Sequence, residues 1–467
     1  MSRTNNLKIV TYSLGEILNK FSSFMFLPIM ALLLSKQEFG ILSVVYSLIL
    51  VLPGVLTLGQ SVSSLKYLTN TKFNQGSVLF QAFLIFFFFN ITIIFILLSL
   101  IFIWDDFSIG GYTLIDIVPI AFIAAACLSF LTIFNQLAQA NGQAKAFVLF
   151  NTVPKLFFVA TVLILCLFFN LNTLLVLYIY CFILLTFVIY AFTRLQSILI
   201  FNFDYKLIIN MLVVGGPLAI NAFALIFNSF ASRTFLNSTG GIEDVADYSF
   251  MLVMSQSCLI FFATFGRLYI PKLFRIMNSN ESHLEFFHRS NNFLYLASFI
   301  IVVLVYLLVI NLSPIYLPEY ELDPVFFGFM VASNFPYVLY ITMVDTISFK
   351  KRGVKLIILN LILGSFTTFV SFFAVKEFGL NGAVLTYFCS AWLQGLMISF
   401  VCRDIFLVSR NIINLIMINL FFLSLVLFLK FFPEFSRDAS MVTLISLLAL
   451  ILFKRSLLQN YIKLFEQ

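Results

Sequence analysis

The chain has 467 residues, of which 62% are hydrophobic and only 10% are charged. Soluble domains carry about 25% charged residues, so this composition excludes a soluble globular enzyme, a disordered chain and a secreted disulfide scaffold. The net charge of +7 is typical of membrane proteins, which collect Lys and Arg on their cytoplasmic side, and nucleic acid is not an expected partner.

Long apolar runs follow one another along the chain, and about 20 consecutive apolar residues suffice for one membrane-spanning helix. They predict an all-α polytopic membrane protein with about fourteen transmembrane helices. The first run starts near Lys8 and lacks a cleavage site of small residues, so we expect a retained helix. The expected helices span residues 8–34, 40–66, 78–103, 114–140, 146–169, 173–193, 207–236, 245–275, 286–311, 324–349, 354–376, 381–402, 411–431 and 439–459.

Charges between the helices predict the topology. With a cytoplasmic N-terminus, nineteen basic residues fall on the inner side, and only Lys36, Lys376, Lys430 and Arg437 fall outside. Acidic residues of the connections fall outside, namely Asp105, Asp106, Glu243, Asp244, Asp247, Glu319, Glu321 and Asp323. This distribution follows the positive-inside rule and predicts that both termini are cytoplasmic.

Several residues recur at a spacing of 209 residues, such as Asn151 with Asn360 and Tyr178 with Tyr387. They predict two six-helix lobes related by a parallel pseudo-two-fold axis, with a terminal helix pair. Such lobes around a central cavity are typical of transporters. The expected boundaries are residues 1–200 for helices 1–6, 201–405 for helices 7–12 and 406–467 for helices 13–14.

The sequence holds no motif for catalysis or nucleotide binding. It has no GxxxxGK[ST] loop, no HExxH and no serine-centred elbow. Its two histidines, His283 and His288, lie in a short connection, and its six cysteines lie in apolar stretches without a CxxC pair. We therefore expect no catalytic residue, no cofactor, no metal and no enzyme activity.

A polar stripe marks the first expected helix. Tyr12, Glu16, Asn19, Lys20 and Ser23 share one face of a helix that turns about 100° per residue. A charge at mid-helix costs at least about 2.5–3.5 kcal/mol in lipid, so we expect Asn19 and Lys20 to line a central cavity. Glu16 is a candidate for ion coupling. Alternatively, Glu16 and Lys20 only neutralise each other at i, i+4 and pack the helix.

Other apolar runs also contain polar or charged residues. Each charged residue has an alternative to a position in the cavity. Lys155 would instead form a structural ion pair, and Arg233 and Arg267 would extend to the membrane surface. Asp345 would pair with a cytoplasmic lysine. Four cations against two carboxylates leave a net-positive interior, which favours a cargo with phosphate or carboxylate groups. The candidates are the cavity residues Lys155, Asn221, Asn228, Arg233 and Arg267 and the ion-coupling residue Asp345.

Three parts of the chain resemble Wzx-type polysaccharide flippases. Residues 13–20 (SLGEILNK), with Leu27-Pro28 and Glu38-Phe39-Gly40, are similar to the start of these proteins. Residues 140–145 (ANGQAK) resemble the connection after their fourth helix, and residues 378–384 (FGLNGAV) resemble their G-x-x-G-A signature at helix twelve. The family belongs to the multidrug/oligosaccharidyl-lipid/polysaccharide exporter (MOP) superfamily.

The resemblance implies a transporter of the bacterial inner membrane that serves O-antigen, lipopolysaccharide or capsule biosynthesis. It would flip an oligosaccharide linked to undecaprenyl pyrophosphate from the cytoplasmic to the periplasmic leaflet by alternating access, and cavity cations would contact the pyrophosphate or acidic sugars. Expected partners are this cargo, membrane lipids and, as a candidate, the polysaccharide polymerase machinery. The alternatives are a cation-coupled multidrug exporter of the same fold and, less favoured by the short outer connections, a membrane polymerase or ligase.

Overall fold

Most of the chain is visible in a computed structural model, and almost all of the visible part is helical. Nine of its helices are long and apolar enough to cross a membrane, or ten when the bent pair at residues 145–165 counts as one span. The predicted all-α polytopic membrane protein is confirmed. The expected helix 439–459 and most of helix 8–34 lie outside the described residues, so the count of fourteen stays a prediction. The described residues are 22, 25–69, 72–103, 108–141, 143–262, 269, 273, 276, 283–320, 322–349, 353–403 and 409–431.

The chain forms two compact units. Unit 1 comprises residues 1–249 and 360–380, and unit 2 comprises residues 250–359 and 381–467. The chain passes between the units within α10 (Ile242–Gln256) and within α15 (Gly353–Val401). The two predicted lobes and their boundaries stay a prediction.

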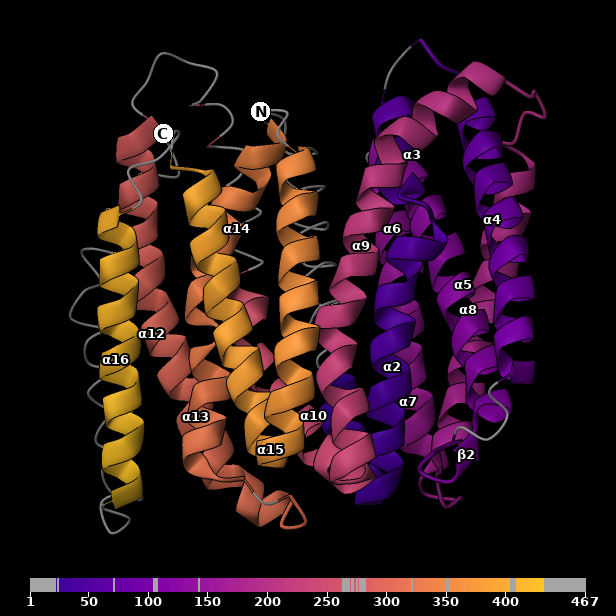
Figure 1. Ribbon diagram of the computed structural model, residues 1–467. Helices are drawn as coiled ribbons and strands as arrows, with labels where there is room; N and C mark the ends of the chain where they lie inside the picture. Colours follow the sequence, from indigo (N-terminus) through magenta and orange to yellow (C-terminus); the bar gives the residue numbers. More distant parts are fainter. Residues whose placement is uncertain are drawn as a thin grey trace. The chain divides into compact units, whose positions relative to one another are not determined.

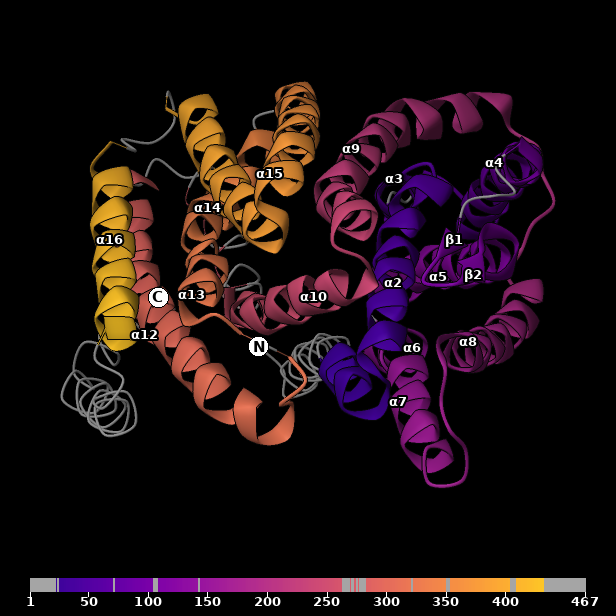
Figure 2. The ribbon, with the colours of Figure 1, turned by 60° about the horizontal axis from the view of Figure 1, so that its bottom comes forward.

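Unit 1 is a helical bundle in which α2 packs against α5 and α9, and α5 packs against α8 (Figures 1 and 2). Its core contains the rings of Phe26, Tyr46, Phe158 and Tyr180, whose neighbouring centroids lie 4.4 to 5.9 Å apart. Its elements, besides parts of α10 and α15, are α2 (Lys36–Leu56), α3 (Gln60–Leu68), α4 (Gln75–Ile103), β1 (Ser108–Ile109), β2 (Tyr112–Thr113), α5 (Leu114–Ala140), α6 (Ala144–Asn151), α7 (Val153–Leu165), α8 (Thr173–Gln196) and α9 (Tyr205–Thr239).

Two expected helices of unit 1 are broken. The expected helix 40–66 is divided into α2 and α3 by residues 57–59, and the expected helix 146–169 is divided into α6 and α7, which bend by 41°. Pro154 at the start of α7 has no backbone N–H, so it leaves a gap in the helical hydrogen bonds at this bend. Hydropathy misses both breaks because the residues on either side remain apolar.

Glu38, near the start of α2, joins three elements at one end of unit 1. Its carboxylate accepts hydrogen bonds from the hydroxyl of Tyr112 at 2.9 Å and from the backbone N–H of Thr173 at 2.6 Å. Tyr112 belongs to a short antiparallel hairpin, β1–β2, whose turn residues Gly110 and Gly111 both have positive φ, as a tight two-residue turn requires. The sequence did not predict this hairpin.

Burial and the hydrogen bond to Glu38 raise the pKa of Tyr112 from 10.0 to about 12. A raised tyrosine pKa favours the folded state at pH values below 10, and this contribution disappears as the pH rises from 10 to about 12. The melting temperature of wild-type protein should therefore exceed that of Tyr112→Phe below pH 10 and converge on it toward pH 12. A difference that stays constant across this range would contradict the assignment.

Unit 2 has its own core, in which Tyr306 packs against Phe327 and Phe422 with centroid distances of 6.0 and 5.7 Å. Its expected helix 324–349 is broken at residues 333–334. The expected helices 354–376 and 381–402 both lie within α15, which kinks between them at Gly379, a residue whose backbone is not helical. Besides parts of α10 and α15, its elements are α12 (His283–Tyr316), α13 (Pro324–Ala332), α14 (Phe335–Phe349) and α16 (Ser409–Phe431).

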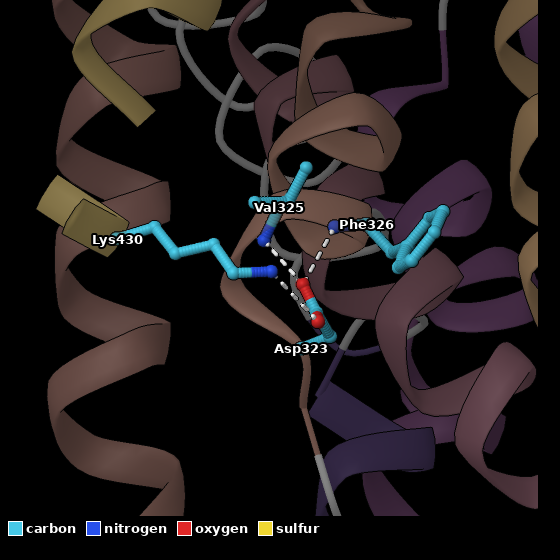
Figure 3. Close-up of polar contacts among 4 residues, drawn as sticks. All are labelled: Asp323, Val325, Phe326 and Lys430. Carbon is cyan, nitrogen blue, oxygen red and sulfur yellow. Dashed lines mark hydrogen bonds and ion pairs between the residues drawn. The ribbon is translucent and has the colours of Figure 1, made fainter. Parts of the chain in front are cut away.

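Asp323 caps α13 and also contacts α16 (Figure 3). One carboxylate oxygen accepts from the backbone N–H groups of Val325 at 2.7 Å and Phe326 at 3.3 Å, and the other lies 3.5 Å from the ammonium of Lys430. Both side chains of the ion pair are more than 40% exposed. Asp323 and Lys430 are two of the residues that the charge distribution placed on the same, outer side.

Asp323→Ala should lower the free energy of unfolding by about 0.5–2 kcal/mol, because it removes the helix cap. Lys430→Ala should cost about 1 kcal/mol or less, since exposed ion pairs contribute little. Asp323→Asn keeps an acceptor for the cap and should behave like Lys430→Ala. Thermal unfolding in detergent compares the three variants, and equal losses for Asp323→Ala and Lys430→Ala would contradict the capping argument.

Candidate functional site

The structure describes the side chains of two predicted site residues, Lys155 and Arg233. The side chains of the other predicted site residues are not described. The side chains of Asn221 and Asn228 on α9 and of Asp345 on α14, and the whole of Glu16, Asn19, Lys20 and Arg267, lie outside the described part of the chain. A single cavity lined by all these residues stays a prediction.

Lys155 lines a cavity of about 160 Å³ within unit 1. It lies in the middle of the bent pair α6–α7, ten residues from each end of the stretch Lys145–Leu165. At about 1.5 Å per residue, this position is about 15 Å from either end, which is half the thickness of a hydrocarbon core of about 30 Å. A lysine at this depth needs a polar environment, because lipid penalises its charge heavily.

Two proline-containing helices shape the wall of this cavity. Pro154 and Lys155 follow the bend between α6 and α7, and Pro53 lies in the last turn of α2. The hydroxyl and the N–H of Thr57 both donate to the carbonyl of Pro53, at 2.9 and 3.1 Å. The cavity therefore lies beside the bend between α6 and α7 and beside the end of α2.

Uncharged polar groups line the same cavity as Lys155. Asn135 and Thr132 of α5 and Asn151 of α6 also line the cavity, and Lys155 is the one charged residue among the described lining residues. Asn135 is only 6% exposed, and its side-chain oxygen has no hydrogen-bond partner among the residues that the structure describes. A buried amide oxygen without a partner is costly, so a donor group is expected to occupy the space beside it.

This set of groups suits a small anion that also carries a hydroxyl. The ammonium attracts negative charge, the amides donate, and the oxygen of Asn135 accepts. The volume is below the range of about 300–1,000 Å³ typical of drug-sized ligands. The cavity therefore has room for a charged group of a larger molecule, but not for the whole molecule.

Arg233 lies elsewhere in unit 1, among α2, α9 and α10. Its Nε donates to the hydroxyl of Ser249 at 3.0 Å, and its guanidinium lies over the ring of Tyr248, 5.8 Å from the centroid. The residue is only 4% exposed, so it is buried between these helices, and its depth in the membrane stays a prediction. Asp247, which precedes Tyr248 in α10, forms an ion pair with Lys36 of α2 at 2.9 Å.

The sequence did not identify Asn135, Thr132 and Asn151 as site residues. Asn135 and Thr132 lie three residues apart on one face of α5, together with Leu128 and Leu131. A polar pair at i, i+3 inside an apolar run is a usable signal. This signal is weaker than that of the charged residues, because burying an uncharged polar group in a membrane helix costs much less free energy than burying a charge.

Comparisons with solved structures identify proteins of the same architecture. A MOP superfamily transporter from Pyrococcus furiosus superposes with a TM-score of 0.56 and 13% identity over 85% of this chain and 95% of its own. An inward-facing structure of a multidrug resistance MATE family transporter of this superfamily gives a TM-score of 0.59 and 13% identity over 86% of this chain and 94% of its own. An outward-facing structure of such a transporter gives a TM-score of 0.57 and 13% identity over 87% of this chain and 96% of its own. No model of a known family and no curated protein matches the chain.

The chain has the fold of the MOP superfamily transporters. It is a multi-pass membrane protein, and the structures that share its fold are transporters rather than enzymes. The superfamily of these structures is the one that the sequence resemblance implied. Membership of this chain in the superfamily and in its flippase subfamily remains a proposal.

Proposed function

We propose that this protein is a flippase for an oligosaccharide repeat unit linked to prenyl pyrophosphate, which it moves from the cytoplasmic to the periplasmic leaflet by alternating access. The observation that carries this proposal is Lys155, a cation at mid-span in a polar cavity. A site of this kind favours a phosphate-bearing cargo over a cationic drug.

Two further observations support the proposal. The fold is shared with a MATE transporter seen in both inward-facing and outward-facing conformations, which fits alternating access. The Pyrococcus furiosus transporter is described as having a binding pocket of reverse polarity that suggests a different function. The sign of the charge in the pocket is therefore a reasonable guide to cargo within this fold.

The test is to delete the gene, measure lipid-linked saccharides by mass spectrometry and stain the surface glycan in parallel. The expected result is accumulation of prenyl-pyrophosphate oligosaccharide on the cytoplasmic side together with loss of surface polymer. Protection of the accumulated saccharide from an external glycosidase separates a block in flipping from a block in polymerisation. An unchanged lipid pool and intact surface glycan, in a strain without a second flippase, would refute the proposal.

A multidrug exporter is the second candidate, because two of the structural neighbours are multidrug resistance transporters. It predicts that the deletion changes drug sensitivity while surface glycan remains intact. The same strain therefore distinguishes the two functions when it is also tested for growth with cationic drugs.

A further inference from the structure

A groove of about 450 Å³ runs between α12 and α16 in unit 2, whereas the Lys155 cavity belongs to unit 1. The two helices run side by side (Figures 1 and 2). Leu296 and Phe421 on its walls are 43% and 63% exposed, so the groove opens outward. Since both helices are long apolar spans, it opens toward lipid.

The groove is polar at one end and apolar at the other. Asn292 and Asn414 line the polar end, three and four residues after the basic residues Arg289 and Arg410 in the sequence. This position corresponds to the boundary between head groups and acyl chains. Further into the membrane the walls are Leu296, Ile418 and finally Phe299 and Phe421, whose rings lie 5.7 Å apart.

A buried hydroxyl points to a missing polar partner. Tyr295 lines the groove and is only 2% exposed, and within the described part of the chain its hydroxyl has no hydrogen-bond partner. Unpaired polar groups in a membrane interior are costly, so a ligand with hydrogen-bonding groups is expected here.

We propose that this groove binds a membrane phospholipid whose head group carries hydroxyls. One acyl chain lies along the apolar walls, and the head-group hydroxyls bond to Tyr295, Asn292 and Asn414. The described lining residues carry no charge, which disfavours an ammonium head group because it would need an acidic acceptor. A hydroxyl suits amides and a tyrosine, since it both donates and accepts.

Native mass spectrometry of the full-length protein in detergent tests the proposal, with phosphatidylglycerol and phosphatidylethanolamine of identical acyl chains as probes. Wild-type protein should retain phosphatidylglycerol in preference. Tyr295→Phe should retain about three- to tenfold less, the effect of one lost hydrogen bond, and the double variant Asn292→Leu/Asn414→Leu should lose the preference. Tyr180→Phe, which removes a buried hydroxyl from the core of unit 1, is the matched control and should behave as wild type.

Equal retention of the two lipids by wild type, or unchanged retention by both groove variants, would overturn the proposal. No retention of either lipid by wild type would overturn it as well. Tyr295→Phe changes no side-chain volume beyond one oxygen, so a folded variant is expected. None of these outcomes depends on the transported cargo, so they stand apart from the flippase assignment.

Discussion

Lys155→Gln is expected to stop export of the lipid-linked cargo while the protein remains folded in the membrane. Loss of a desolvated charge contact costs about 2–5 kcal/mol, which weakens binding of a phosphate group about thirty-fold or more. Glutamine still fits a cavity lined by amides, and it removes a charge from mid-span, so membrane insertion should not suffer. Complementation of the deletion strain, read as surface glycan and as accumulated lipid-linked saccharide, measures the effect.

The control for this experiment is Lys145→Gln, which removes an exposed lysine at the start of the same bent helix pair. It should complement fully at equal protein level. Lys155→Arg, which keeps the charge in a longer and wider side chain, should give partial activity. Full complementation by Lys155→Gln would show that the cavity charge does not bind the cargo, and the phosphate-based argument for the flippase would then fail.

The sequence predicted the helical membrane class because the apolar runs are long and nearly free of charge. It did not predict where the spans break. The interruptions at residues 57–59 and at Thr152 lie inside apolar runs, and they follow from proline and from close backbone contacts that hydropathy does not report. Gly379 shows the opposite outcome, because this glycine with φ 53° kinks the chain between the expected helices 354–376 and 381–402, where the sequence predicted a break.

Of the residues that line the candidate site, the sequence predicted only the charged one, Lys155. Lys155 was detectable because a cation inside an apolar run is expensive. Its neighbours Asn135 and Asn151 come from other helices, and one sequence does not show which helix faces meet. For Arg233 the sequence could not choose between cavity and membrane surface, since that choice depends on contacts with Ser249 and Tyr248 in the folded protein.

Gly59→Ala is expected to prevent unit 1 from folding properly. Gly59 lies between α2 and α3 with φ +68°, a conformation that disfavours side chains. A Cβ atom there would lie 2.1 Å from the carbonyl oxygen of Gly215 on α9, and a Cβ at Gly215 would lie 2.5 Å from the carbonyl of Leu58. The obstacles are backbone atoms, which cannot move aside without displacing a helix. We expect a loss of at least about 2 kcal/mol in stability.

Gly216→Ala provides the matched control, because it adds the same methyl group one residue further along α9, where no atom lies within 4 Å. Alanine should raise stability there by up to about 1 kcal/mol through its better helix propensity. Size-exclusion profiles and melting temperatures in detergent compare the two variants, and equal behaviour would contradict a close α2–α9 crossing. The crossing also bears on the site: Pro53, six residues before Gly59, forms part of the Lys155 cavity. A Gly59→Ala protein that still reaches the membrane should therefore show impaired export before it shows complete unfolding.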